Sequence, residues 1–378
     1  MESSGAGLSP AFAQLRTRID AAIATFLNDS FEAFQVLSSE TSDEFTGAVK
    51  NSLAGGKRFR ALSSTVGAAT AIAIEDGDTG NSEQLLLRAA TDSNLALGAA
   101  LEMYQAAALV HDDVVDRASE RRGRPAAHVE FAQHHESNLW SGSSEHFGMS
   151  AAILAGDYLL AAGPYTLENA ATGDHGIELR RQFELMSGEV AFGQYLDLRA
   201  SNVPLDSDFL STDRIVDVVR LKSARYSVAH PVSLGARQAG APKEVVLKLQ
   251  RIFEAAGIAF QLRDDDLGVF GDLRATGKSA SGDLIEKKRT VLLALTYENA
   301  PIQEKTVLRE IYAAPEAPTD SQIEQVREIM ASHGRERHEA FIAEYRALAQ
   351  KRLQEANFPP AAEDICHAFI NLVVDRKS

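Results

Sequence analysis

The stretch Ala106–His128 (AAALVHDDVVDRASERRGRPAAH) places several acidic side chains at the end of an apolar segment. Asp112 and Asp116 are four residues apart and share one face of the expected helix, with Asp113 beside them, so their carboxylate oxygens can converge on a hard divalent cation. Three carboxylates this close repel one another, and burial would raise their pKa values unless a metal or cationic groups compensate. We therefore expect this cluster to bind Mg²⁺.

Basic residues follow the acids at Arg121, Arg122 and Arg124. Mg²⁺ usually takes one or two protein carboxylates and completes its shell with water and phosphate oxygens, and arginine binds phosphate bidentately. An acidic cluster beside an arginine cluster therefore indicates a metal-bridged phosphate ester. The alternative is a solvated, charged helix end that is stabilised by pairs of opposite charge four residues apart.

A second basic element, LAGGKRFRA, covers Leu53–Ala61. Its two glycines let backbone N–H groups approach an anion, while Lys57, Arg58 and Arg60 supply positive charge. We interpret this element as a diphosphate cradle. The alternative is an ordinary basic turn on the surface.

The residues that precede the first acidic cluster predict the shape of the space beneath it. Gln105 lies seven residues before Asp112 and therefore almost directly below it, and Ala107 and Ala108 form a ledge of small side chains. Tyr104 lies between two and three turns down, about 12 Å from Asp112 at 1.5 Å per residue. We therefore expect an open space directly below the aspartates that ends at the ring of Tyr104. The alternative is that the alanines only allow close helix packing.

Polar groups also interrupt two later apolar helical patterns. Gln194 and Asp197 are spaced to share one helix face and can add an amide and a carboxylate to the same cavity. Lys222 and Ser223 put an ammonium and a hydroxyl inside an amphipathic segment. The alternatives are ordinary surface groups and a lysine whose stem lies along apolar surface.

A second acidic cluster stands far along the chain, in FQLRDDDLGVFGD. It contains Asp264, Asp265 and Asp266 on another apolar helix, and two such clusters that face each other across a bundle can hold several metal ions. The basic, glycine- and serine-containing segment Gly277–Thr290 follows and could close over bound phosphate and exclude water. The alternative for that segment is a mobile, solvated loop.

Composition and periodicity predict an all-α protein. Apolar residues recur at helical spacing from Phe12 onward, and strand-like alternation is scarce. In 378 residues, 45% apolar and 24% charged residues are typical of a soluble globular protein, and we expect one domain over residues 1–378. Prolines, Pro164 among them, are expected to break helices. The expected loops are Glu75–Ser82, His134–Gly148, Ala200–Thr212, Phe270–Gly282 and Ala313–Asp320.

Charge and targeting signals exclude several classes of protein. A net charge of −15 argues against nucleic acid or an anionic membrane as the main partner. The single cysteine, Cys366, excludes an intramolecular disulfide framework. The N-terminus lacks the features of a signal peptide, and no apolar run is long enough to span a bilayer. We expect a cytoplasmic protein without a stable membrane anchor.

Taken in order, these motifs resemble those of the trans-isoprenyl diphosphate synthases (the polyprenyl synthetase family), from about Ala54 to Thr290. The matching residues are Gly55, Gly56, Lys57 and Arg60 for GGKxxR; Asp112, Asp113 and Asp116 for DDxxD; Arg121 and Arg122 for the arginine pair; Gln194 and Asp197 for GQxxDL; Lys222 and Ser223 for the Lys-Thr pair; and Lys278 and Lys288 for the closing lysines.

Two positions depart from the family pattern. The second motif, FQxxDDxxD, would require aspartate where Gly268 stands, so only Gln261, Asp264 and Asp265 carry over. Asp266 and Asp272 are the candidates to replace the missing carboxylate. Gln105 is a smaller departure, since the family often has histidine there.

The resemblance implies an isoprenoid synthase helical bundle around a deep central cavity, a homodimer, and three Mg²⁺ ions per active site. It assigns metal binding to Asp112, Asp113, Asp116, Asp197, Asp264 and Asp265. It assigns the allylic diphosphate (dimethylallyl, geranyl or farnesyl) to Arg121, Lys222 and Lys278, and isopentenyl diphosphate to Lys57, Arg60, Gln105 and Arg122, with Gln194, Ser223, Gln261 and Lys288 also near substrate.

The resemblance also implies the reaction. Diphosphate leaves the allylic substrate, the double bond of isopentenyl diphosphate attacks the resulting cation, and a proton is lost. In the family, bulky residues four and five positions before the first aspartate shorten the product, and here both are alanine, Ala107 and Ala108. We therefore predict growth past farnesyl, with Tyr104 as the floor and geranylgeranyl diphosphate as the main product.

Two rival interpretations remain open. A class I terpene cyclase shares acidic Mg²⁺ sites but needs no second diphosphate cradle, and the chain lacks the Asn/Ser/Glu motif of that class. A noncatalytic regulatory subunit of a prenyl synthase would keep the fold, and Gly268 is the main feature that favours it.

Overall fold

The computed structural model describes residues 9–34, 40–77, 81–171, 173, 175–271 and 282–375, and helices dominate these ranges, as predicted. The elements are α1 (Ser9–Ala33), α2 (Glu40–Leu53), α3 (Phe59–Glu75), α4 (Ser82–Ala89), α5 (Asp92–Val115), β1 (Glu120–Arg121), β2 (Arg124–Pro125), α6 (Ala127–Ser137), α7 (Ser144–Leu167), α8 (Gly176–Asn202), the 3₁₀ turn η2 (Asp208–Leu210), α9 (Thr212–Val219), the π-helix η3 (Arg220–Ala229), α10 (His230–Gln238), α11 (Lys243–Phe270), α13 (Gly282–Ile285), α14 (Val291–Asn299), α15 (Ile302–Ala313), α16 (Asp320–His333), α17 (Arg335–Ala356) and α18 (Pro360–Val374).

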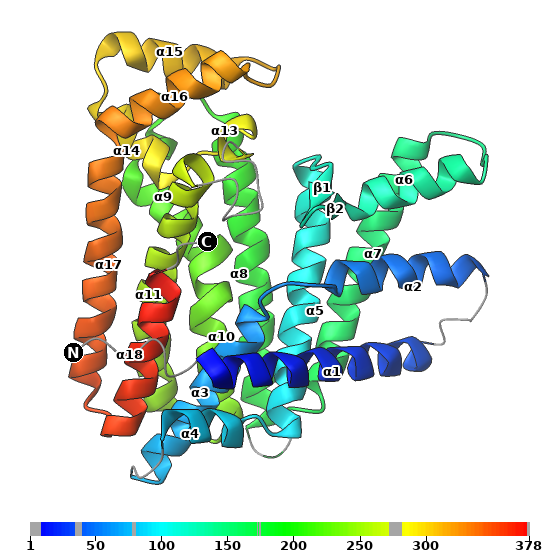
Figure 1. The fold of residues 1–378 in the computed structure, drawn as a ribbon, viewed down its shortest axis with the longest axis vertical. Coiled ribbons are helices and arrows are strands. Elements are labelled where there is room, and N and C mark those ends of the chain that lie inside the picture. Colours follow the sequence, from blue (N-terminus) through cyan, green and yellow to red (C-terminus); the bar gives the residue numbers. More distant parts are fainter. Residues whose placement is uncertain are drawn as a thin grey trace.

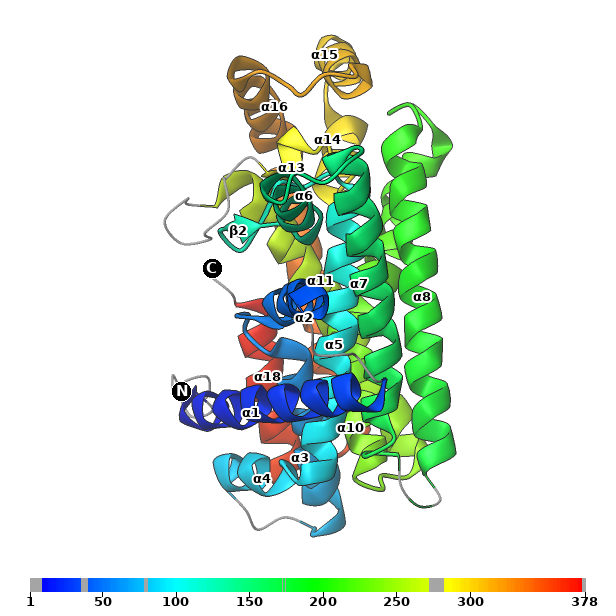
Figure 2. The same cartoon turned by 90° about the vertical axis from the view of Figure 1, so that its right-hand side faces the viewer.

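The long helices run along the long axis of the molecule. Figures 1 and 2 show α5, α7, α8, α11 and α17 in this orientation, with α1 and α2 lying across them. Helices α15 and α16 cap one end. Both α5 and α11 finish toward that same end, where β1, β2 and α13 also lie (Figure 1). The two acidic clusters, which stand at the ends of α5 and α11, are therefore brought to one end of the bundle.

The apolar core holds these helices in register. One continuous cluster of buried side chains includes residues from α1 to α18. The centre of the Phe369 ring, in α18, lies 6.3 Å from the ring centre of Phe12, 5.8 Å from that of Phe59 and 5.7 Å from that of Phe253. The last helix therefore ties α1, α3 and α11 together. The single domain over residues 1–378 stays a prediction, which this continuity favours.

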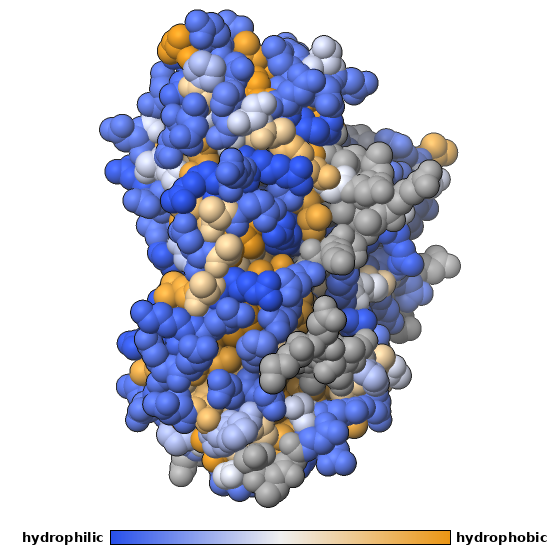
Figure 3. Space-filling model, turned by 60° about the vertical axis from the view of Figure 1, so that its left-hand side comes forward, coloured by the Kyte–Doolittle hydropathy of each residue, from blue (hydrophilic) through white to orange (hydrophobic). Residues whose placement is uncertain are grey.

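Polar side chains dominate the face of the molecule shown in Figure 3, with apolar residues visible in patches between them. This is the surface expected of helices that bury one apolar stripe each. Among the described helices, none combines the length and hydropathy that a membrane span would require.

Two local predictions were wrong, and one small element was not expected. The expected loop His134–Gly148 is mostly helical: α6 extends to Ser137, α7 begins at Ser144, and buried His135 contributes to the packing between them. Pro164 lies inside α7 instead of ending it. It comes three residues before the helix ends, so few backbone hydrogen bonds are lost. The short antiparallel pair β1–β2 was not expected either.

Candidate active site

Asp112 stands at the centre of the polar contacts that the first acidic cluster makes. Its Oδ1 accepts a hydrogen bond of 2.8 Å from Gln194 Nε2 and lies 3.7 Å from Lys222 Nζ. Lys222 Nζ in turn donates to Asp197 Oδ2 at 2.5 Å. Burial opposes the charge on Lys222, but the carboxylates of Asp197 and Asp112 outweigh it and raise the pKa of the ammonium. Three elements thus meet around one half-buried cation, and Gln194, Asp197 and Lys222 lie together near Asp112 as the sequence predicted, while their roles toward substrate and metal stay predictions.

The π-helix η3 positions Lys222 and the half-buried Ser223. Single turns of π-helix are often found at functional sites. Helix α8 can approach it closely because residue 193 is glycine: a Cβ there would lie 2.5 Å from the backbone nitrogen of Lys222. Gly257 of α11 makes a similar approach to the carbonyl of Ala224. These two glycines let α8 and α11 pack closely against η3, and α8 thereby brings Asp197 to the lysine.

A tight hairpin carries the arginines. Arg122 and Gly123 have φ values of 55° and 71°, which is the pattern of a type I′ turn between β1 and β2. Arg121 Nε donates to Asp113 Oδ1 at 2.8 Å, and Arg121 Nη2 lies 3.7 Å from Asp112 Oδ2. Burial raises the pKa of Asp113 despite this arginine. Asp113 therefore holds Arg121 at the acids in this structure, and its role as a metal ligand stays a prediction.

The predicted diphosphate cradle also assembles. Gly55 and Gly56 have φ values of 70° and 94°, and a Cβ on Gly56 would lie 3.0 Å from the guanidinium of Arg122. Arg122 Nη1 donates to the carbonyl of Ala54 at 3.1 Å. Burial lowers the pKa of Arg122, and the charges of neighbouring arginines, Arg58 and Arg60 among them, add to the effect. Cations gathered this closely form a site that an anion would stabilise.

Arg60 and Gln105 point to a polar ligand at this cradle. The guanidinium of Arg60 lies 4.0 Å from the centre of the Tyr226 ring, and its Nη2 donates to Ser227 Oγ at 2.6 Å. Within the described ranges, Arg60 Nε and Gln105 Oε1 are buried without a hydrogen-bond partner. Buried polar atoms are rarely left unsatisfied, so a bound ligand with polar atoms is the simplest partner for them.

The second acidic cluster is anchored by its own helix. Gln261 Nε2 donates to Asp265 Oδ1 at 2.8 Å. Burial raises the pKa of Asp265 well above its usual range, and the charges of Asp283 and Asp264 raise it further. A cation placed beside these carboxylates would relieve the repulsion.

Asp266 does not replace the carboxylate that is missing at Gly268. Its Oδ1 accepts from Arg335 Nε at 3.2 Å and its Oδ2 lies 3.6 Å from Arg263 Nη1, so the side chain is 3% exposed and turned toward α17. This candidate was wrong because a pair of arginines holds the side chain elsewhere. The other candidate, Asp272, and the predicted substrate ligand Lys278 lie outside the described residues.

Lys288 connects the two acidic clusters. Its Nζ donates to Asp283 Oδ1 at 3.0 Å and to Glu286 Oε2 at 2.9 Å. Burial opposes its charge, yet these two carboxylates raise its pKa. The charge of Lys288 lowers the pKa of both Asp116 and Asp265, so both clusters lie within electrostatic range of one ammonium. The sequence predicted Lys288 but gave no signal for Asp283 or Glu286.

The donor set fits Mg²⁺. Partial burial and the charge of Asp112 raise the pKa of Asp116 to about 6, so the cluster is short of positive charge. No three acidic, histidine or cysteine side chains in the described part of the chain converge closely enough to enclose a cation by themselves. Mg²⁺ keeps several waters and phosphate oxygens in its shell and therefore suits carboxylates that supply only part of it.

The floor below the acids is aromatic. Tyr104 is buried, donates to the carbonyl of Ser187 at 3.1 Å, and meets the rings of Phe183 and Tyr226 edge to face, each at 5.9 Å. Ala108 is half-buried and lies one turn above Tyr104 and one turn below Asp112.

Ala107 faces a different neighbour. It is fully buried, and it lies midway between Met103 and His111, which border the α7 glycines Gly163 and Gly156. Residues four apart share a helix face, so Ala107 belongs to the contact with α7. Ala107 therefore packs against α7, and the role predicted for Ala108 in limiting product length stays a prediction.

Comparisons with known proteins agree with this site. The family model described as polyprenyl synthetase matches residues 42–330. The geranylgeranyl diphosphate synthase of Saccharolobus solfataricus is 29% identical over 306 residues, which cover 80% of each chain. The geranylfarnesyl diphosphate synthase of Aeropyrum pernix is 31% identical over 267 residues, 69% of this chain and 73% of that one.

A solved structure matches nearly the whole chain. Geranylgeranyl pyrophosphate synthase from Corynebacterium glutamicum, complexed with isoprenyl diphosphate and magnesium, has a TM-score of 0.82 at 30% identity and covers 95% of this chain and 98% of its own. The chain therefore belongs to the polyprenyl synthetase family. The resemblance to trans-isoprenyl diphosphate synthases and the all-α isoprenoid synthase fold are both confirmed.

The metal-free protein should be more stable when Asp116 is replaced by asparagine. Because folding raises the pKa of this carboxyl from 3.8 to about 6, the folded state holds the proton more tightly, and stability is lost as pH rises through that interval. We expect Asp116→Asn in EDTA to melt above the unchanged protein at about pH 7, by a margin that solvent screening of this exposed carboxyl keeps small, with the gap closing toward about pH 4. Differential scanning calorimetry measures this, and a gap that does not vary with pH would contradict it.

Proposed function

We propose that this chain is a Mg²⁺-dependent prenyltransferase that condenses isopentenyl diphosphate with an allylic diphosphate to give a longer trans-polyprenyl diphosphate. The observation that carries the proposal is the presence of two anion sites of different character. One joins the carboxylates of Asp112 and Asp116 to the cations Lys222 and Arg121. The other is the arginine-rich cradle of Arg60 and Arg122 beside Gly56.

Each site suits one diphosphate. The acidic site, with its nearby lysine and arginine, suits the diphosphate that must leave with its negative charge. Mg²⁺, when bound by Asp112, Asp116 and Asp264, would supply the positive charge that stabilises that leaving group. Two carboxylates pair with Arg58 at the edge of the cradle: Asp20 Oδ1 lies 2.6 Å from Arg58 Nε, and Glu102 Oε2 lies 3.7 Å from Arg58 Nη1. The cradle suits the diphosphate of isopentenyl diphosphate, which is not cleaved.

The bond changes follow from this placement. The allylic C–O bond breaks, and its electron pair goes to the departing diphosphate, whose oxygens Lys222 and Arg121 are placed to bind. The double bond of isopentenyl diphosphate then forms the new C–C bond to the allylic carbon. A proton leaves the former isopentenyl unit to the released diphosphate, and a new double bond remains. The side chains act by fixed charge and position, which is how preorganised sites lower barriers of this kind.

The rival functions fit the geometry less well. A terpene cyclase acts on one diphosphate and gives no reason to gather Arg58, Arg60 and Arg122 around a glycine turn. A noncatalytic regulatory subunit has no need to keep Lys222, Asp197 and Gln194 in contact with Asp112.

Purified protein should release diphosphate and form a longer prenyl chain from isopentenyl diphosphate, an allylic primer and Mg²⁺. Asp112→Ala should lower turnover at least about 100-fold, because it removes a carboxylate from the site where charge develops. Asp29→Ala, on the exposed side of α1, is the matched control and should keep full activity. Mass spectrometry of the extracted product measures turnover, and circular dichroism checks that both variants stay helical. An inactive parent protein, or an active Asp112→Ala, would refute the proposal.

We propose geranylgeranyl diphosphate as the main product. The support is local: the small side chain of Ala108 is half-buried one turn below Asp112, and the buried ring of Tyr104 lies one turn below Ala108. The similar proteins are named for products of different length, geranylgeranyl diphosphate in one and geranylfarnesyl diphosphate in another. The proposal for the product of this chain therefore rests on the residues below Asp112 and not on those names.

Ala108→Phe should shorten the product so that farnesyl diphosphate becomes the main one. The larger ring would fill the space one turn below Asp112 and stop the chain before it reaches Tyr104. Ala343→Phe, at an exposed position of α17, is the control and should leave the product lengths unchanged. A radiolabelled chain-length assay separates the outcomes; unchanged products from Ala108→Phe would rule out this steric account.

We also propose that the protein is a homodimer that pairs through α7 and α8, which run along the face seen in Figure 2. Both helices expose large apolar side chains: Leu154 is 61% exposed on α7, and Leu185 and Phe192 are 54% and 55% exposed on α8. On α8 the series Leu185, Phe192 and Tyr195 follows the seven-and-three spacing that packs against another helix. Exposed apolar patches of this kind mark protein interfaces.

Sedimentation equilibrium should give a dimer of the 40.8 kDa chain. Leu185→Glu should shift the mass toward the monomer because it buries a charge in the proposed interface. Leu372→Glu changes an exposed leucine of α18 and should leave the dimer intact. A monomeric parent protein would contradict the proposal.

A further inference from the structure

Gly268 leaves a gap in the second acidic cluster that another residue of the chain fills. The glycine lies on α11, one turn beyond Asp264. A Cβ built at this position would overlap the carboxylate of Asp283, with Oδ2 as the nearest atom. The carboxylate of Asp283 therefore already occupies the space into which a side chain at residue 268 would begin.

Asp283 is also electrostatically part of the cluster. Among the charges that raise the pKa of Asp265, that of Asp283 has the largest effect, larger than that of the adjacent Asp264. The two carboxylates come from elements that are separated in sequence, α11 and α13, so their proximity is a product of the fold.

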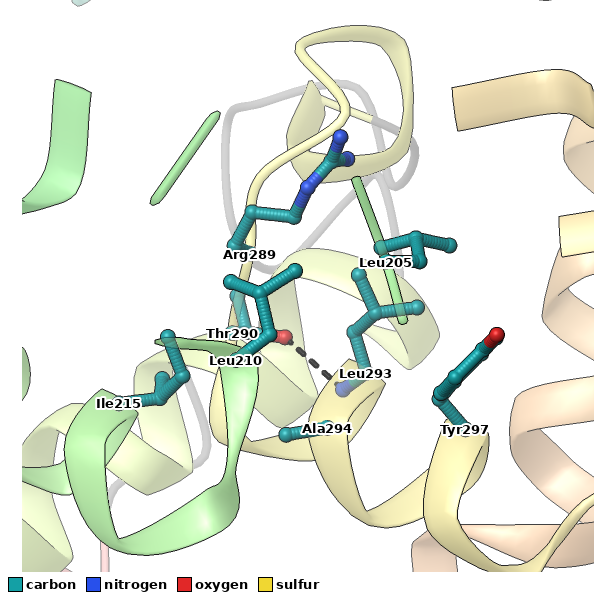
Figure 4. A pocket seen from close by; sticks show the side chains of 8 residues that line it. All are labelled: Leu205, Leu210, Ile215, Arg289, Thr290, Leu293, Ala294 and Tyr297. Carbon is teal, nitrogen blue, oxygen red and sulfur yellow. Dashed lines mark hydrogen bonds between the residues drawn. The ribbon is translucent and has the colours of Figure 1, made fainter. Parts of the chain in front are cut away.

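The backbone after Asp283 fixes it in place. Lys288 N donates to the carbonyl of Asp283 at 3.0 Å, and Lys287 Nζ ties the next turn to the carbonyls of Ala314 and Glu316, at 2.5 and 2.7 Å. Thr290 then caps α14 by accepting from the backbone nitrogen of Leu293 at 3.2 Å (Figure 4).

The guanidinium of Arg289 packs against helix α15. It is 4.6 Å from the centre of the Tyr312 ring of α15, and the residue is 7% exposed. Figure 4 shows Arg289 and Thr290 entering a region lined by apolar side chains such as Leu210 and Ile215. The segment that carries Asp283 is thus held at several points, and the carboxylate is aimed at Gly268 by a fixed backbone.

We propose that Asp283 supplies the third carboxylate of the second acidic cluster, in the space that an aspartate at position 268 would use, and that glycine at 268 is what admits it. This proposal rests on the proposed function, since the cluster is the one that would hold Mg²⁺. One oxygen of Asp283, Oδ1, pairs with Lys288, while Oδ2 is the atom that lies over Gly268. The carboxylate thus orients the lysine and lends its charge to the metal-binding side of the cluster.

The experiment moves the carboxylate between the two positions and measures metal binding directly. Mn²⁺ replaces Mg²⁺ as the probe, inorganic diphosphate is present, and electron paramagnetic resonance counts free Mn²⁺ in the absence of turnover. Asp283→Ala should weaken Mn²⁺ binding about tenfold, which corresponds to about 1.4 kcal/mol. Gly268→Asp alone should also weaken it and lower the melting temperature, because two carboxylates would compete for one space.

The double variant Gly268→Asp with Asp283→Ala tests whether a carboxylate in this space supports Mn²⁺ binding. It places a carboxylate on α11 and empties the space that Asp283 used, so Mn²⁺ affinity should return to within about threefold of the unchanged protein. If the double variant binds Mn²⁺ as weakly as Asp283→Ala, the carboxylate does not act from this space and the proposal fails.

Glu286→Gln is the matched control, because Glu286 also pairs with Lys288 but does not approach Gly268. It should weaken Mn²⁺ binding clearly less than Asp283→Ala does. If it weakens binding as much as Asp283→Ala does, then Asp283 acts only through Lys288 and the proposal is wrong. Failure of the proposed function has a different signature: the unchanged protein would then bind no Mn²⁺ in the presence of diphosphate.

Discussion

Repulsion between carboxylates is the constraint on which the rest of this structure depends. Asp112 and Asp116 belong to one acidic cluster and Asp265 to the other, and burial raises the pKa of both Asp116 and Asp265. Lys222 and Lys288 lie within reach of these acids and offset part of the charge. In the folded protein the carboxylates therefore repel one another, and bound divalent cations would relieve this repulsion. The relief contributes to the free energy of binding the cations and, through them, a diphosphate.

The helices are arranged to maintain this crowding. Glycine at 193 lets α8 approach the π-helix closely enough for Asp197 to pair with Lys222 while Gln194 donates to Asp112, and glycine at 257 lets α11 pack against the same π-helix. The type I′ turn at Arg122 and Gly123 sets one arginine against the acids and the next against the glycine cradle. Small residues and tight turns thus determine the distances between charges that are far apart in sequence.

Much of the site could be predicted from sequence because its motifs are local. The spacing of Asp112 and Asp116 and the glycine cradle gave both the chemistry and the family, and the helical periodicity gave the fold. What the sequence could not give depends on tertiary contacts. Arg335 of α17 draws Asp266 away from the site, while α13 brings Asp283 to it. The segment expected as a loop from His134 is instead the end of α6, where His135 is buried. The separate roles of Ala107 and Ala108 follow from which helix faces α7.

Anomalous diffraction from crystals grown with Mn²⁺ and a diphosphate tests the central claim most directly, because it locates the cations without requiring turnover. The account predicts anomalous peaks beside Asp112 and Asp116 on α5 and beside Asp264 on α11, all contacting one diphosphate that Lys222 also binds. Peaks confined to one cluster, or diphosphate bound away from both, would contradict the account.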